Sequence, residues 1–134
     1  MFWPGRRSIG TLAYHVYQVP DAFLQAVENG LEDLTSTYNA APPASVKSVQ
    51  DIAAYGSRIT QSIERWWSQL PDKSCRQTVK TYYGERSLHE LLERSTWHSA
   101  QHARQILSVL ERLQVKPNGP LSAKDYAGLP MPKG

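Results

Sequence analysis

Apolar side chains recur at steps of three and four residues in three separate stretches of the chain, which is the period of an amphipathic α-helix. The first stretch begins after Ser8, a residue that can cap a helix N-terminus, and ends at Asn29-Gly30. Pro20 lies inside this stretch, but the apolar period continues in register on both sides of it. The pattern therefore predicts one helix that is kinked at Pro20.

Two later stretches have the same period. The second helix is predicted to begin near Ser48, which forms a capping pair with Asp51, and to stop at Pro71. The third is predicted to begin at Ser87, which stands three residues before Glu90 in the S-x-x-E form of a capping box. Its period continues to residue 115, just before the sequence KPNGP.

The remaining segments are predicted to be loops. The connector at 73–86 is not periodic and is expected to contain at most a short extended piece at 78–83. The tail, residues 117–134, is rich in Pro and Gly and is expected to pack over the helices without forming a long element. We therefore predict one all-α domain over 1–134, with an N-terminal arm at 1–6 and three long helices.

The composition excludes several classes of protein. A chain of 134 residues, with 40% hydrophobic and 20% charged residues, is typical of one soluble globular domain. The net charge of +3 comes without a basic block, so nucleic-acid binding is not expected, and no apolar run is long enough to span a membrane. The single cysteine, Cys75, cannot form an intramolecular disulfide, so we expect a cytoplasmic location.

His98 and His102 lie four residues apart in the third predicted helix, within TWHSAQHARQIL. Such residues are neighbours, with Cβ atoms about 5–6 Å apart, so both imidazoles can reach one divalent metal at about 2.0–2.1 Å. His15 borders the inward stripe of the first helix and is the better placed third ligand, whereas His89 is expected to be exposed. The spacing alone leaves open a second interpretation, in which the histidines form a hydrogen-bonded polar patch in a helical core.

The stretches RSIGTLAYHV and TWHSAQHARQIL together resemble the DinB/YfiT-like superfamily of up-down helical bundles. In that family one histidine lies early in a helix and two more follow on a later helix as HxxxHxxQ. His15, His98, His102 and Gln105 match these positions. The stretch YAGLPMP is similar to the C-terminal region of some members, and the resemblance covers nearly the full chain from Arg6 onward.

The resemblance implies a divalent metal, zinc or nickel, held by His15, His98 and His102, with Gln105 orienting one of them. It also implies a thiol S-transferase, in which a thiol such as bacillithiol, mycothiol or glutathione binds through its sulfur as a thiolate and attacks a small electrophile. No Asp or Glu lies near the histidine pair on its helix face, so the catalytic residues stay unassigned. A non-catalytic binding or stress-response module, and a structural oligomer whose histidines bind nothing, remain alternatives.

The sequence departs from the family at its start. Family members usually have a full helix before the helix that carries the first histidine, and we interpret that helix as missing here. Since a bundle closes its core most readily with four helices, three helices leave an apolar face to be covered. We expect a homodimer to bury that face.

Overall fold

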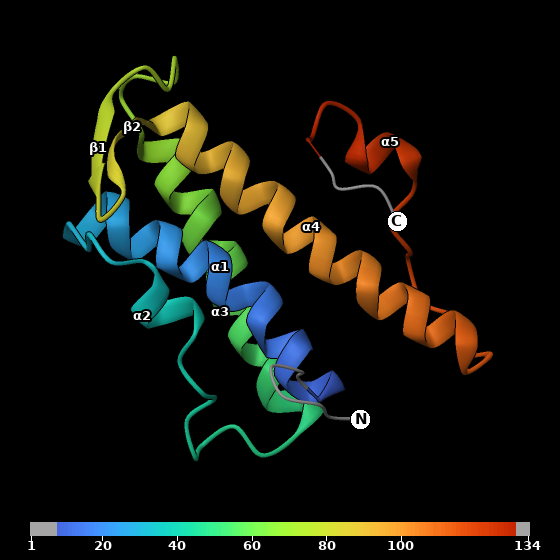
Figure 1. The fold of residues 1–134 in the computed structure, drawn as a ribbon. Coiled ribbons are helices and arrows are strands. Elements are labelled where there is room, and N and C mark those ends of the chain that lie inside the picture. The colour runs from blue at the N-terminus through green and yellow to red at the C-terminus, as the bar shows by residue number, and fades with distance from the viewer. Residues whose placement is uncertain (1–7, 131–134) are drawn as a thin grey trace.

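The computed structural model describes residues 8–130 and contains the three long helices that the apolar periods predict (Figure 1). Helix α1 spans Ile9–Asn29, α3 spans Val49–Gln69 and α4 spans Leu88–Arg112. Two single-turn helices, α2 (Thr35–Tyr38) and α5 (Ala123–Tyr126), lie in the loop after α1 and in the C-terminal tail. The prediction of an all-α fold is confirmed, while the predicted arm at 1–6 lies outside the described residues.

The helix starts follow the capping signals. The Ser8 side chain accepts a hydrogen bond from the backbone N–H of Thr11 at 3.1 Å. Ser48 and Asp51 form a reciprocal capping box at the start of α3. At the start of α4, the Ser87 side chain accepts from the backbone N–H of Glu90 at 3.1 Å.

The helix ends follow the backbone conformation. Gly30, at φ 71°, ends α1 in the left-handed conformation that glycine adopts at little cost. Pro20 lies inside one continuous helix α1, as predicted, and the kink expected there stays a prediction. Helix α4 ends at Arg112, three residues earlier than predicted, because Gln114 also adopts a left-handed conformation at φ 57°.

The connector before α4 differs from the prediction. It forms an antiparallel hairpin in which β1 (Thr78–Thr81) pairs with β2 (Gly84–Ser87), whereas the sequence indicated only one extended piece. Most of these side chains are polar or charged, so the hairpin lacks the alternation of apolar residues by which a strand is recognised. Gly84, at φ 107°, provides the conformation that the turn needs.

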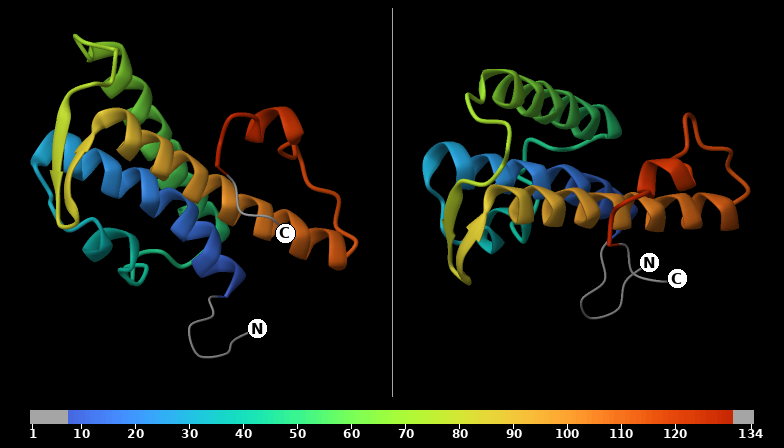
Figure 2. Two further views of the ribbon diagram at one scale, coloured as in Figure 1. Left: turned by 45° about the horizontal axis from the view of Figure 1, so that its top comes forward. Right: turned by 90° about the horizontal axis from the view of Figure 1, so that it is seen from above.

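Helix α1 packs against both other long helices, and α4 runs antiparallel to it (Figure 1). Figure 2 shows α1 and α4 side by side in one layer, with α3 lying over them. The main core lies between the second half of α1 and the start of α4, where Phe23 and Leu91 are 0% and 1% exposed. Trp66 of α3 closes this core, with its ring 5.0 Å from that of Phe23.

A groove of about 420 Å³ lies between the three long helices, and the start of the tail lines it at residues 118–121. Only this start of the tail lines the bundle; the single turn of α5 that follows does not pack over the helices, in contrast to the expectation. The predicted homodimer stays a prediction, as do the domain boundaries and the cytoplasmic location. Within residues 8–130, no helix is both long enough and apolar enough to cross a lipid bilayer.

Candidate metal centre

Helix α4 brings His98 and His102 together because they lie one turn apart on the same face. Their ring centroids are 4.9 Å apart, and both side chains are half-buried. Trp97 stacks on His98 with the ring centroids 5.5 Å apart. His89 lies at the start of the same helix and is exposed, with Nε2 3.7 Å from a carboxylate oxygen of Glu93. His89 therefore belongs to the surface, as predicted.

Pro20 helps to fix α1 against α4. Because proline has no backbone N–H, the carbonyl oxygen of Val16, four residues earlier, loses its usual helical donor. The hydroxyl of Ser99 donates to this oxygen at 2.9 Å across the two helices. Since Val16 follows His15 and Ser99 follows His98, this hydrogen bond holds the backbone of α1 against α4 directly beside the histidines.

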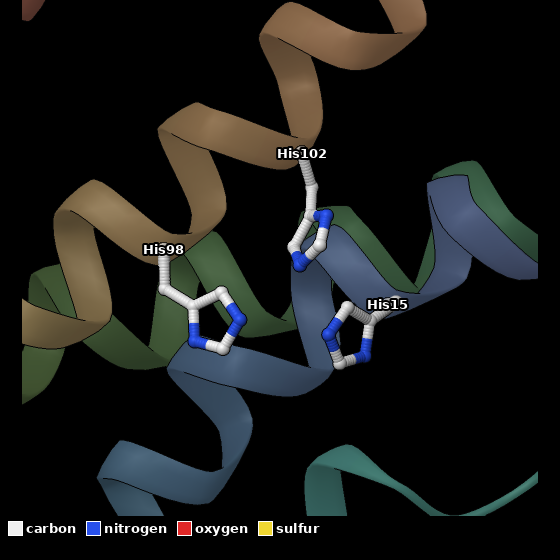
Figure 3. A group of neighbouring side chains, drawn as sticks. All are labelled: His15, His98 and His102. Atoms are coloured by element: carbon white, nitrogen blue, oxygen red, sulfur yellow. The ribbon is translucent and has the colours of Figure 1, made fainter. Parts of the chain in front are cut away.

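His15 completes the group from α1. It is 1% exposed, and its ring centroid lies 5.7 Å from that of His98 and 4.7 Å from that of His102. Figure 3 shows a nitrogen of each ring directed toward the space between the three side chains. One nitrogen from each ring lies within 4.8 Å of the others. The structure thus brings together the three histidines that the sequence singles out.

Gln18 determines which nitrogen of His15 carries the proton. Its amide nitrogen donates to the backbone carbonyls of Thr37 at 3.2 Å and Ala40 at 2.7 Å, and carbonyls only accept. The amide oxygen must then be the atom that lies 3.3 Å from Nδ1 of His15. Since that oxygen can only accept, Nδ1 is the protonated nitrogen and Nε2 has the lone pair that a metal needs.

Gln105 has the same relation to His102. Its amide oxygen lies 2.8 Å from Nδ1 of His102, and it too follows its histidine by three residues. The sequence interpretation singled out Gln105 but not Gln18. The sequence contained the same signal for both glutamines, because each follows its histidine with the spacing HxxQ.

Tyr38, the last residue of α2, lies beside the histidines. The ring of Tyr38 lies 5.9 Å from that of His98 and 6.3 Å from that of His15. Burial, and then the hydrogen bond with Tyr82, raise the pKa of Tyr38 to about 12, although Arg94 lowers it. Tyr38 therefore has a protonated hydroxyl at neutral pH.

The donor set fits a divalent metal. Three neutral imidazoles are the ligands of open, catalytic zinc sites, and their outer nitrogens commonly donate to an oxygen, as at His15. In a tetrahedral site, two nitrogens that are each about 2.1 Å from the ion lie about 3.4 Å apart. The three nitrogens lie within 4.8 Å of one another, so they would move closer together on binding one ion. His15, His98 and His102 could therefore hold a divalent metal.

Comparison with known proteins agrees with this geometry. No curated protein and no solved structure matches the chain. A family model for the DinB superfamily matches residues 2–106, a range that includes the three histidines and both glutamines. Since the matched range is well over half of the 134 residues, the chain belongs to the DinB superfamily.

Proposed function

We propose that the protein is a divalent-metal-dependent transferase that joins a low-molecular-weight thiol to a small electrophile. The observation that carries the proposal is the convergence of three imidazoles, one of which Gln18 holds in the tautomer that a metal requires. A divalent metal on three imidazoles supplies Lewis-acid chemistry at its open position and lowers the pKa of a thiol there. Zinc and nickel are the metals that we expect.

The residues of the chain would bind and orient the reactants. His15, His98 and His102 would hold the metal, and Gln18 and Gln105 would hold two of the rings in place. Tyr38, whose ring lies 5.9 Å from that of His98, would border the reactants on one side. In the overall reaction the sulfur forms a bond to the electrophilic carbon, the leaving group departs with its electron pair, and the thiol proton passes to solvent.

The test combines metal content with turnover. Purified protein would be assayed with bacillithiol, mycothiol and glutathione in turn, with 1-chloro-2,4-dinitrobenzene as the electrophile. We expect thiol-dependent release of chloride that is lost on chelation and returns with added zinc or nickel. A metal-loaded protein that transfers none of the three thiols to this or any of a panel of alkyl halides and epoxides would contradict the proposal.

A second candidate is a non-catalytic binding or stress-response module that functions as an oligomer. The groove between the three long helices favours it, because most of its lining is apolar and Val49 and Leu121 on its rim are 75% and 40% exposed. The occupant that we expect is a second copy of the chain. Light scattering at micromolar concentration would detect the homodimer. A monomer at that concentration would contradict this candidate.

A further inference from the structure

A small cavity lies directly beside the histidines. Its α4 residues are Leu91, Arg94, Ser95 and His98, so it follows the helix face that leads up to the first histidine of the pair. The other walls are Val19 of α1, Leu34 and Tyr38 around α2, and Tyr83 of the hairpin turn. The cavity measures about 20 Å³, which is room for about one water molecule. His98 thus belongs both to the histidine group and to this cavity.

Arg94 is the cationic side chain of the cavity. It precedes His98 by four residues, so the two side chains lie on one face of α4. Its guanidinium carbon lies 4.8 Å from the centre of the Tyr83 ring, a distance at which a cation and an aromatic face attract each other. The guanidinium is therefore held at the cavity by the hairpin turn, while the residue as a whole stays exposed to solvent.

The charge of Arg94 is not offset by an acid. Across residues 8–130, no carboxylate oxygen lies within 4.0 Å of its guanidinium. Arg86 provides a comparison, because it contacts the same Tyr83 ring at 5.0 Å but also has a carboxylate oxygen of Glu90 at 4.0 Å. Arg86 does not line the cavity. Of the two arginines on this ring, only Arg94 offers an uncompensated positive charge beside the histidines.

We infer that Arg94 receives a carboxylate group of a substrate, so that the protein acts on small molecules with a carboxylate close to their reacting atom. This inference rests on the proposed function, since the histidines are taken as the place of reaction. Guanidinium binds carboxylate through two parallel N–H···O bonds, and the polar residues Tyr38 and Ser95 line the same cavity.

Binding of propionate to metal-free protein tests Arg94 without any turnover. The probe would be titrated by NMR into the wild type, Arg94→Gln, Arg94→Lys and the matched control Arg86→Gln. Because the charge-assisted hydrogen bonds of the guanidinium would be lost, we expect about 10-fold or more weaker binding in Arg94→Gln. Arg94→Lys should bind with intermediate affinity, since lysine keeps the positive charge but lacks the two parallel N–H donors of guanidinium. Arg86→Gln should bind propionate like the wild type.

Two results would overturn the inference. One is equal propionate affinity in the wild type and Arg94→Gln, with both proteins shown to be folded by their melting temperatures. The other is inorganic phosphate binding more tightly than propionate at the same residue. If the protein proves unable to transfer thiols, Arg94-dependent binding of propionate still stands, so failure of this inference and failure of the proposed function are distinguishable.

Steady-state kinetics would identify which reactant carries the carboxylate. Mercaptoacetate would be compared with 2-mercaptoethanol as the thiol, and iodoacetate with iodoacetamide as the electrophile. We expect Arg94→Gln to raise KM about 10-fold for the carboxylate form of one reactant and to leave its neutral analogue unchanged. An equal rise for charged and neutral forms of both reactants would contradict carboxylate recognition by Arg94.

Discussion

The two interfaces of α1 differ in what holds them together. Toward α4, the helix contributes the buried imidazole of His15 and the Val16 carbonyl that accepts from Ser99. Toward α3, it contributes the ring of Tyr14, which stacks on Tyr55 with the centroids 4.6 Å apart. Polar groups at the first interface bring the three candidate metal ligands together, whereas the aromatic pair at the second buries apolar surface. Helix α1 therefore joins the interface of the candidate metal site to a supporting one.

The α1–α3 interface has a polar contact of its own, but not one suited to chemistry. The hydroxyl of Tyr55 donates to the carboxylate of Asp21, and burial followed by this hydrogen bond raises the pKa of Tyr55. Gly56 lies so close to α1 that an added Cβ would overlap the ring of Tyr17. The comparison predicts that changes at the α4 interface alter metal binding, while changes at the α3 interface alter only stability.

The largest expected effect is that of His102→Ala on metal affinity. Loss of an outer hydrogen-bond partner of a ligand costs about 10–100-fold in metal affinity, and loss of one of three ligands should exceed that range. The measurement is competition for zinc with a chromophoric chelator. His89→Ala is the matched control, because it removes an exposed imidazole from the same helix and should leave the affinity unchanged.

Gln18→Leu should have the next largest effect. It removes the acceptor that fixes the tautomer of His15, so we expect about 10–100-fold weaker zinc binding. Gln25→Leu, on the same helix but bonded to Asp21 and Asn29, should bind zinc like the wild type. Imidazole ¹⁵N shifts give a direct readout, since His15 should lose its single tautomer in Gln18→Leu. Unchanged shifts would contradict the role given to Gln18.

Tyr55→Phe should reduce stability without affecting zinc binding. A hydrogen bond to a charged group contributes about 1.5–3 kcal/mol, and the partly buried position of the Asp21–Tyr55 pair favours the lower end. Chemical denaturation would measure the loss. The double variant Asp21→Asn/Tyr55→Phe should cost less than the sum of the single variants, because both remove the same interaction. Weaker zinc binding in Tyr55→Phe would contradict the separation of the two interfaces.

The same pair should respond to alkaline pH. Since the pKa of Tyr55 is raised in the folded state, its stabilising contribution is full below the ordinary tyrosine value of about 10 and is lost as pH rises above it. The difference in stability between wild type and Tyr55→Phe should therefore be constant near neutral pH and shrink above about pH 10. A difference that grows with pH would contradict the direction of the shift.

The smallest expected effect is that of Ser99→Ala, at about 1 kcal/mol of stability, because the mutation removes one hydrogen bond. The effect should depend on Pro20. In a Pro20→Ala background the Val16 carbonyl regains a helical N–H donor, so Ser99→Ala should cost less there. Chemical denaturation of the wild type, Ser99→Ala, Pro20→Ala and the double variant would measure both costs. Equal costs in both backgrounds would show that Pro20 does not create the need for Ser99.

The sequence predicted those features that depend on neighbouring residues. Ser8, Gly30 and Ser48 mark helix ends through contacts within a few positions, so their roles could be inferred directly. The hairpin was missed because its polar strands show no alternation of apolar residues. Gln18 could have been singled out by its HxxQ spacing, but its carbonyl partners, Thr37 and Ala40, lie 19 and 22 residues away, where periodicity cannot locate them.

In the candidate site, too, the sequence predicted what depends on neighbouring residues and missed what depends on distant ones. The HxxxH spacing placed His98 and His102 on one helix face, and the inward stripe of the first helix indicated His15. Family resemblance added Gln105. The hydrogen bond from Ser99 to Val16 needs the relative position of two helices that are 83 residues apart in sequence at this point. The role inferred for Arg94 could not be predicted from neighbouring residues, because it depends on the contact with the ring of Tyr83 in the hairpin turn.

Zinc-edge X-ray absorption on zinc-loaded protein tests the central claim most directly, with metal content by mass spectrometry on the same sample. The account predicts about one zinc per chain and three imidazole nitrogens at about 2.0–2.1 Å, with both lost in His98→Ala/His102→Ala. One nickel per chain with three imidazole ligands would support the account equally well. A protein that takes up neither metal, or holds zinc without imidazole ligands, would contradict the account and leave the three histidines as a polar group within the helical core.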